Sequence, residues 1–143
     1  MVKLLALIFE SQMLELDMGL LPVLLQAGIC ALGYVVAVYV GHYAVVALLG
    51  RLGVMGRDGV PGGGALIGAL ERALTVTFVL LGQYTALGLV LTAKSITRFE
   101  ELKNRRFAEY YLIGTLASML WAILVGLATR WVCFEGVELI AGL

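Results

Sequence analysis

The sequence is poor in charged residues. Lys, Arg, Asp and Glu make up 14% of its 143 residues, whereas 62% are hydrophobic. Soluble domains carry about 25% charged and about 45–50% apolar residues, so the composition excludes an ordinary soluble domain, and its hydrophobicity excludes disorder. Ten basic and ten acidic residues cancel, which leaves no basic face for nucleic acid. We therefore expect a small integral membrane protein.

Histidine and cysteine are also scarce. The chain has one histidine, His42, and two cysteines, Cys30 and Cys133, which lie far apart and form no CxxC spacing. Multi-histidine metal sites and haem bundles are therefore excluded, and we expect no metal and no cofactor. Cys30 lies in an apolar run and is predicted to be an inert thiol. No serine or cysteine has a candidate base beside it, so the protein is predicted not to be an enzyme.

What the sequence does contain is long uncharged runs. They predict an all-α integral membrane fold with an N-terminal amphipathic helix over 1–19 and a three-span membrane domain over 20–143. The spans are expected at about 20–50, 66–93 and 109–131. Arg72 and Lys94 bracket 21 uncharged residues, which as one helix would be about 32 Å long and match the hydrocarbon core. In the third span, Tyr111 and Trp131 are placed about 30 Å apart, as aromatic belts are.

The segments outside the spans differ in character. The polar positions of 1–19 are mostly acidic, so this helix is predicted to pack on protein rather than on anionic lipid. Residues 51–64 are rich in glycine and predict a flexible turn. Residues 94–109 are charged and predict a cytoplasmic helical hairpin that turns near Asn104, with an i,i+4 ion pair between Glu101 and Arg105. The hairpin residues of interest are Lys94, Arg98, Glu101 and Arg105.

Lysine and arginine counts predict the orientation. Lys3 and the segment between the second and third spans supply six basic residues, and the other side has at most four. Because cytoplasmic loops are enriched in Lys and Arg, we expect a cytoplasmic N-terminus and a C-terminus on the opposite side.

Small residues recur every four positions in each predicted span. In a membrane, such faces let helix backbones approach closely. They either hold the three helices of one protomer together or also build an oligomer. The helix-packing residues are Gly33, Ala37, Gly41, Gly82, Ala86, Gly114, Ser118, Ala122 and Gly126.

Four polar residues are candidates for an intramembrane site. Gln83 lies at the centre of the second predicted span, where it either bonds a neighbouring helix or lines a pore. Glu71 and Arg72 lie where that span begins, and adjacent helical residues do not face each other. Either Glu71 caps the helix dipole and the Arg72 side chain snorkels to the interface, or the two residues form an ion or proton site. His42 either packs at the interface or senses pH.

Residues 68–126 carry several short motifs. These are Glu71-Arg72-Ala73-Leu74, Gly82-Gln83-Tyr84, Ala93-Lys94-Ser95-Ile96, Arg98-Phe99-Glu100 and the run from Ala108 to Thr115. On these motifs the segment resembles the C-terminal membrane segment of a family of uncharacterised small bacterial membrane proteins. The resemblance covers less than half of the chain. It implies a location in the bacterial inner membrane and names no substrate, and it points to Glu71, Arg72, Gln83, Lys94 and Arg98. With the orientation expected from the lysine and arginine counts, the C-terminus of this multi-pass protein is predicted to be periplasmic.

Two functions are compatible with these features. The first is a self-associating membrane protein that forms or lines an ion-permeable path. The alternative is a non-catalytic accessory or scaffold subunit of a larger membrane complex, which would dock through the acidic N-terminal helix and the charged hairpin. A membrane enzyme is a third and weaker hypothesis. The expected partners are membrane lipid and either further copies of the chain or other membrane subunits.

Overall fold

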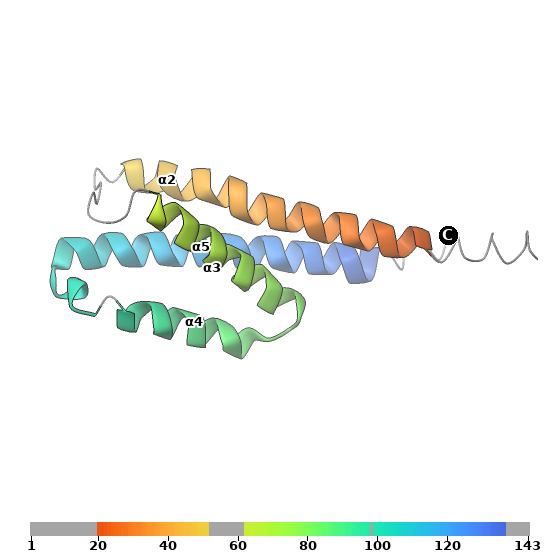
Figure 1. The fold of residues 1–143 in the computed structure, drawn as a ribbon. Helices are drawn as coiled ribbons and strands as arrows, with labels where there is room; N and C mark the ends of the chain where they lie inside the picture. The colour runs from red at the N-terminus through yellow and green to blue at the C-terminus, as the bar shows by residue number, and fades with distance from the viewer. Residues whose placement is uncertain (1–19, 52–61, 98, 137–143) are drawn as a thin grey trace, which may run out of the picture.

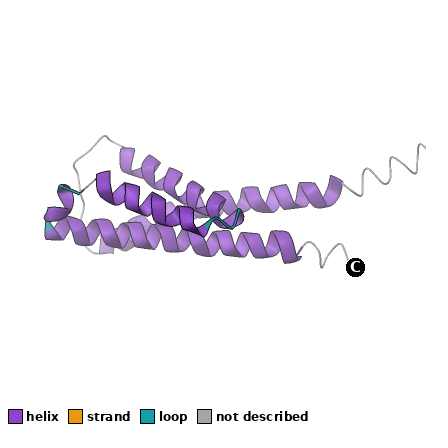
Figure 2. Cartoon of the chain, turned by 90° about the horizontal axis from the view of Figure 1, so that it is seen from below, coloured by secondary structure: helices purple, strands orange, loops and turns teal. Residues whose placement is uncertain are grey.

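The computed structural model describes residues 20–51, 62–97 and 99–136, and within these ranges it contains helices and turns but no strand (Figures 1 and 2). The all-helical class is thus confirmed. A first helix, Leu20–Arg51, includes a π-helical turn η1, Val36–Val40, and ends with α2, Gly41–Arg51. The other elements are α3, Gly63–Leu80; α4, Tyr84–Thr97; η2, Glu101–Lys103; α5, Arg105–Trp131; and η3, Val132–Gly136. The amphipathic helix predicted over 1–19 lies outside the described residues.

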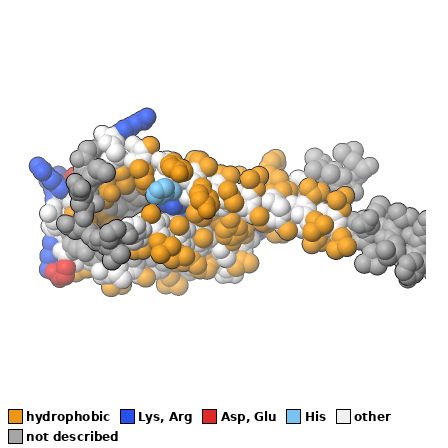
Figure 3. Space-filling model, turned by 45° about the horizontal axis from the view of Figure 1, so that its top comes forward, with side chains coloured by type: hydrophobic (Ala, Val, Ile, Leu, Met, Phe, Trp, Pro, Cys, Tyr) orange, Lys and Arg blue, Asp and Glu red, His pale blue; other side chains and the backbone are white. Residues whose placement is uncertain are grey.

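Three helices are long and apolar enough to cross a membrane. They are Leu20–Arg51, Gly63–Leu80 and Arg105–Phe134, the last of which joins α5 to the start of η3. Large apolar side chains along them point outward (Figure 3). In water such a surface would be unfavourable, whereas in lipid it is the expected one.

The second predicted span is not one helix. α3 ends at Leu80, the chain turns, and α4 begins at Tyr84 and runs back beside α3 (Figure 1). Gly82 has φ +70°, a left-handed conformation that commonly ends helices. The guanidinium of Arg130 donates hydrogen bonds of 3.3 and 3.0 Å to the carbonyls of Val79 and Leu80. The Val79 carbonyl also accepts a hydrogen bond of 3.1 Å from the Gly82 backbone N–H. Carbonyls at a helix end lack the full set of intrahelical partners, so the two hydrogen bonds from Arg130 stabilise the break.

The α3–α4 hairpin determines which helix ends lie at the same end of the bundle. The first helix and α4 run in one direction along the bundle, and α3 and α5 run in the other (Figure 1). Leu20 and Trp131 therefore lie at one end, and Arg51 and Asn104 lie at the other. The sequence had placed the chain's start beside the Lys94–Glu109 segment, and the start of the first helix lies at the opposite end instead.

The bundle core is built from small side chains. Ala37, Val76 and Ala122 are fully buried where the first helix, α3 and α5 meet. Gly126 faces α3 so closely that a Cβ atom there would lie 3.0 Å from two side-chain carbons of Val79. Gly33 of the first helix is in similarly close contact with Thr129. The small-residue faces thus pack helices within a single protomer.

The turn before α5 lies near Asn104, where the sequence placed it. The Asn104 side chain caps α5 by accepting hydrogen bonds from the backbone N–H groups of Arg106 and Phe107. Arg105 pairs with Glu109 at 2.9 Å. The expected Glu101–Arg105 spacing requires one continuous helix, but Glu101 belongs to η2 and Arg105 is the first residue of α5.

Candidate site: a polar cavity inside the helix bundle

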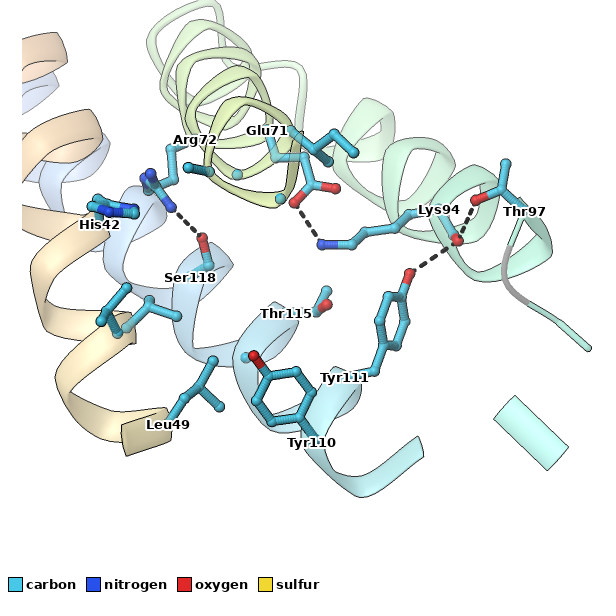
Figure 4. Close-up of a pocket in the computed structure, with 17 residues that line it drawn as sticks. His42, Leu49, Glu71, Arg72, Lys94, Thr97, Tyr110, Tyr111, Thr115 and Ser118 are labelled. Carbon is cyan, nitrogen blue, oxygen red and sulfur yellow. Dashed lines mark hydrogen bonds and ion pairs between the residues drawn. The ribbon is translucent and has the colours of Figure 1, made fainter. Parts of the chain in front are cut away.

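A cavity of about 490 Å³ lies between α2, α3, α4 and α5 (Figure 4). Its lining residues come from α2, the last turn of α4 and the N-terminal parts of α3 and α5, so it lies toward the end of the bundle that carries Arg51 and Asn104. The space-filling view shows a hollow at this end, with the single histidine at its edge (Figure 3). One wall is apolar and includes Val45, Val46, Leu49 and Ile67. The polar lining consists of His42, Glu71, Arg72, Lys94, Thr97, Tyr110, Tyr111, Thr115 and Ser118.

Arg72 is the most buried charged residue in the described ranges, with 4% of its surface exposed. It reaches from α3 toward α5, where its Nη1 donates a hydrogen bond of 3.2 Å to the hydroxyl of Ser118. Its Nε is buried and has no hydrogen-bond partner among the residues that the structure describes. The predicted snorkelling to the interface does not occur, because the side chain is directed into the bundle.

Trp121 lies one helical turn beyond Ser118 on α5 and presents a second donor of this kind. Its indole Nε1 is buried, and no group within the described ranges forms a hydrogen bond with it. The two side chains meet at Gly41, where a Cβ atom would lie 2.6 Å from Trp121 Cδ1 and 2.9 Å from Arg72 Cδ. Only a glycine lets the first helix approach both. Two unpaired buried N–H donors therefore belong to side chains that share one contact point.

Lys94 and Glu71 form an ion pair across the α3–α4 hairpin, with Nζ and Oε2 2.6 Å apart (Figure 4). Both side chains are largely buried, with 21% and 16% exposed. Tyr111 of α5 donates a hydrogen bond of 2.9 Å to the backbone carbonyl of Lys94, and the Lys94 ammonium lies 5.3 Å from the centre of its ring. This pair joins three helices and compensates its own charges.

The charges of the cavity therefore do not balance. Among the described lining residues, Lys94 and Arg72 share one carboxylate, Glu71: it forms its ion pair with Lys94, and Arg72 makes its hydrogen bond to a neutral hydroxyl. An uncompensated charge in a low-dielectric site is unfavourable, as is an unpaired buried donor. A ligand that brings negative charge and acceptor atoms would relieve both costs. No group of three or more His, Cys, Asp and Glu residues that could hold a metal occurs among the described residues.

The hairpin brings together residues that were predicted separately. His42, Glu71, Arg72 and Lys94 all line the cavity, and Lys94 belongs to it rather than to a hairpin outside the membrane. Gln83 does not line the cavity. It is exposed in the turn between α3 and α4, where its backbone N–H donates a hydrogen bond of 2.8 Å to the Phe78 carbonyl. It lies at the end of the hairpin and not halfway along a helix. Arg98 and the side chain of Glu101 lie outside the described part.

Other predicted residues serve packing or the turn. Ala37, Gly41, Ser118, Ala122 and Gly126 are buried in the bundle, and Gly114 lies against Leu49. Gly82 occupies the turn and not a helix face, whereas Ala86 is half-buried on α4. Sequence reasoning placed Ser118 in a small-residue stripe and missed its hydroxyl as the partner of Arg72. The available signal for Trp121 was its position midway between Tyr111 and Trp131, and nothing in the sequence connects it to Arg72.

Comparison with protein-family models, with curated proteins and with solved structures gave no match. The resemblance to a bacterial membrane family therefore stays a prediction. The function has to be inferred from the cavity itself.

Proposed function

We propose that the chain is a multi-pass protein of the bacterial inner membrane that binds an anion in the cavity around Arg72. Self-association of such protomers would form a path that anions can cross. The ion-permeable path predicted from the sequence would then be selective for anions over cations. The observation that carries the proposal is the buried guanidinium Nε of Arg72, which has no hydrogen-bond partner among the described residues. Trp121, whose buried indole N–H is unpaired in the same way, meets Arg72 at Gly41 but does not line the cavity itself.

The anion is favoured by the chemistry of the donors. A guanidinium presents several N–H groups in a fixed plane and matches carboxylate or phosphate oxygens. Arg72 uses Nη1 on Ser118 and retains Nε for a ligand. Hydrogen bonds between a charged donor and a charged acceptor are about twice as strong as neutral ones. An anion placed there would satisfy donors that no side chain in the described ranges satisfies.

The distribution of basic residues suggests how the protein is oriented. The described Lys and Arg residues outside the cavity gather at the end where it opens: Arg51, Lys103, Arg105 and Arg106, against Arg130 at the other end (Figure 3). Because basic residues favour the cytoplasmic side, we place this end in the cytoplasm. The start of the first helix at Leu20 and the end of α5 at Trp131 are then periplasmic. The cytoplasmic N-terminus expected from the sequence falls on residues 1–19, which lie outside the described residues.

Anion binding can be measured through Trp121. The chain has two tryptophans, Trp121 and Trp131, so W131F leaves Trp121 as the sole reporter beside Arg72. We expect chloride or inorganic phosphate to change the fluorescence of W131F protein in nanodiscs in a saturable way. The change should disappear in W131F/R72M. It should persist in W131F/R51M, which removes an exposed arginine from the same end of the bundle.

Transport is tested separately in liposomes. With unequal chloride concentrations across the membrane, the reversal potential should report anion over cation permeability, and R72M should reduce the current much more than R51M. Folded W131F protein without any anion-dependent fluorescence would refute the binding proposal. Binding without flux would refute the path and favour the accessory-subunit function.

A further inference from the structure

The two cysteines, which the sequence gave no reason to connect, face each other at the end of the bundle opposite the cavity. The sulfur atoms of Cys30 on the first helix and Cys133 in η3 are 3.3 Å apart. They are separated by 103 positions in the chain. We propose that Cys30 and Cys133 form an intramolecular disulfide that covalently joins the first helix to the end of α5.

The surroundings hold both thiols in place. Gln26, one helical turn before Cys30, donates a side-chain hydrogen bond of 3.1 Å to the backbone carbonyl of Cys133. The Cys133 thiol lies 3.8 Å from the carbonyl of Gln26. Next along the interface, Gly33 is in close contact with Thr129. The helices are thus already fixed against each other, and a bond would require only a short approach of two sulfurs, since a disulfide has an S–S distance of about 2.05 Å.

The two thiols differ in access. Cys133 is 2% exposed and Cys30 is half-buried. A disulfide-bearing oxidant, such as an oxidised oxidoreductase or oxidised glutathione, would therefore meet Cys30 first. The Cys30 thiolate attacks one oxidant sulfur and releases the other as a thiol, which forms a mixed disulfide. The Cys133 thiolate then attacks the Cys30 sulfur and releases the second thiol. Two electrons and two protons pass from the cysteines to the oxidant.

The compartment required by this chemistry agrees with the orientation proposed above, on which this step of the inference rests. Cys133 follows Trp131, at the end of the bundle that we place toward the periplasm. Disulfides persist in the bacterial periplasm and are rare in the cytosol. A staple here would hold the periplasmic ends of the first helix and α5 together. The helices around the cavity, near the cytoplasmic end, would not be joined by the disulfide.

Peptide mapping tests the bond directly. Trypsin cleaves after Arg130 and after Arg51, so Cys30 and Cys133 end up in separate peptides that only a disulfide can join. Membranes from cells are first treated with an alkylating reagent that blocks free thiols. We expect the two peptides to be joined, lighter by two hydrogen atoms than their sum, and to separate on reduction. C30S and C133S should each abolish the joined species.

A matched variant tests the geometry apart from the compartment. In C30S/A31C the thiol moves by one residue, about 100° around the helix, to a position that is exposed. Purified, reduced wild-type protein in nanodiscs should close with oxidised glutathione, and C30S/A31C should form the bond much more slowly or not at all. Failure of wild type to close, or equal closure of both proteins, would refute the pairing. Two alkylated thiols in the cell sample would refute the disulfide in the cell. If the purified protein still closes, the fault then lies in the proposed orientation and not in the packing or in anion binding.

Discussion

Gly41 is where the first helix packs against Arg72 and Trp121, and replacing it with alanine tests that contact. Its backbone has φ −60° and ψ −35°, an ordinary helical conformation that alanine adopts without strain. The effect of the substitution is therefore steric. A Cβ atom would lie 2.6 Å from Trp121 Cδ1 and 2.9 Å from Arg72 Cδ, and neither is the free end of a flexible chain.

The expected size follows from two opposing effects. Overpacking of a filled core costs typically 1–3 kcal/mol, and here a rigid indole and an anchored arginine both have to move. Replacing glycine by alanine within a helix stabilises the helix by at most about 1 kcal/mol. We expect Gly41→Ala to lower the free energy of unfolding by about 1–2 kcal/mol, which is a factor of about 5–30 in the unfolding equilibrium.

The assay is unfolding by SDS in mixed micelles, followed by circular dichroism. Gly28→Ala is the matched control, because it lies in the same first helix and a Cβ atom there meets nothing within 4 Å. This control should be neutral or more stable than wild type. If Gly41→Ala were as stable as Gly28→Ala, the close approach at Arg72 and Trp121 would be refuted.

Two further predictions concern the α3–α4 hairpin. A topology reporter inserted between Arg51 and Gly62 and one inserted at Asn104 should report the same compartment, since both positions lie at one end of the bundle; opposite compartments would mean that the second span is one continuous helix. Gly82→Ala should lower the free energy of unfolding by about 1–2 kcal/mol in the SDS assay, because φ +70° is unfavourable for alanine. Gln83→Leu, at an exposed turn position, should have little effect, and equal losses in both variants would contradict the turn.

Some features of this protein follow from the sequence alone because they depend on local composition. Low charge and long apolar runs determine that the chain is helical and apolar enough to span a membrane. Asn104 marks the start of α5 because an asparagine side chain can cap the helix that follows it. The sequence indicates Glu71 and Arg72 as candidate functional residues because charges are rare in apolar helices.

The tertiary structure decided what these elements do together. In the sequence Gly82 is one more small residue in an apolar run, whereas in the structure its left-handed backbone and the hydrogen bonds from Arg130 of α5 end α3 there. That break folds α4 back, so that Lys94 forms an ion pair with Glu71 and the two cations Lys94 and Arg72 share this one carboxylate.

The same reasoning applies at the other end of the bundle, where Cys30 and Cys133 become neighbours across 103 positions. Periodicity and composition report on contacts within a few residues along the chain. Contacts between helices depend on where each helix ends and on the direction of the next one. Here the turn at Gly82 determines the directions of α4 and α5.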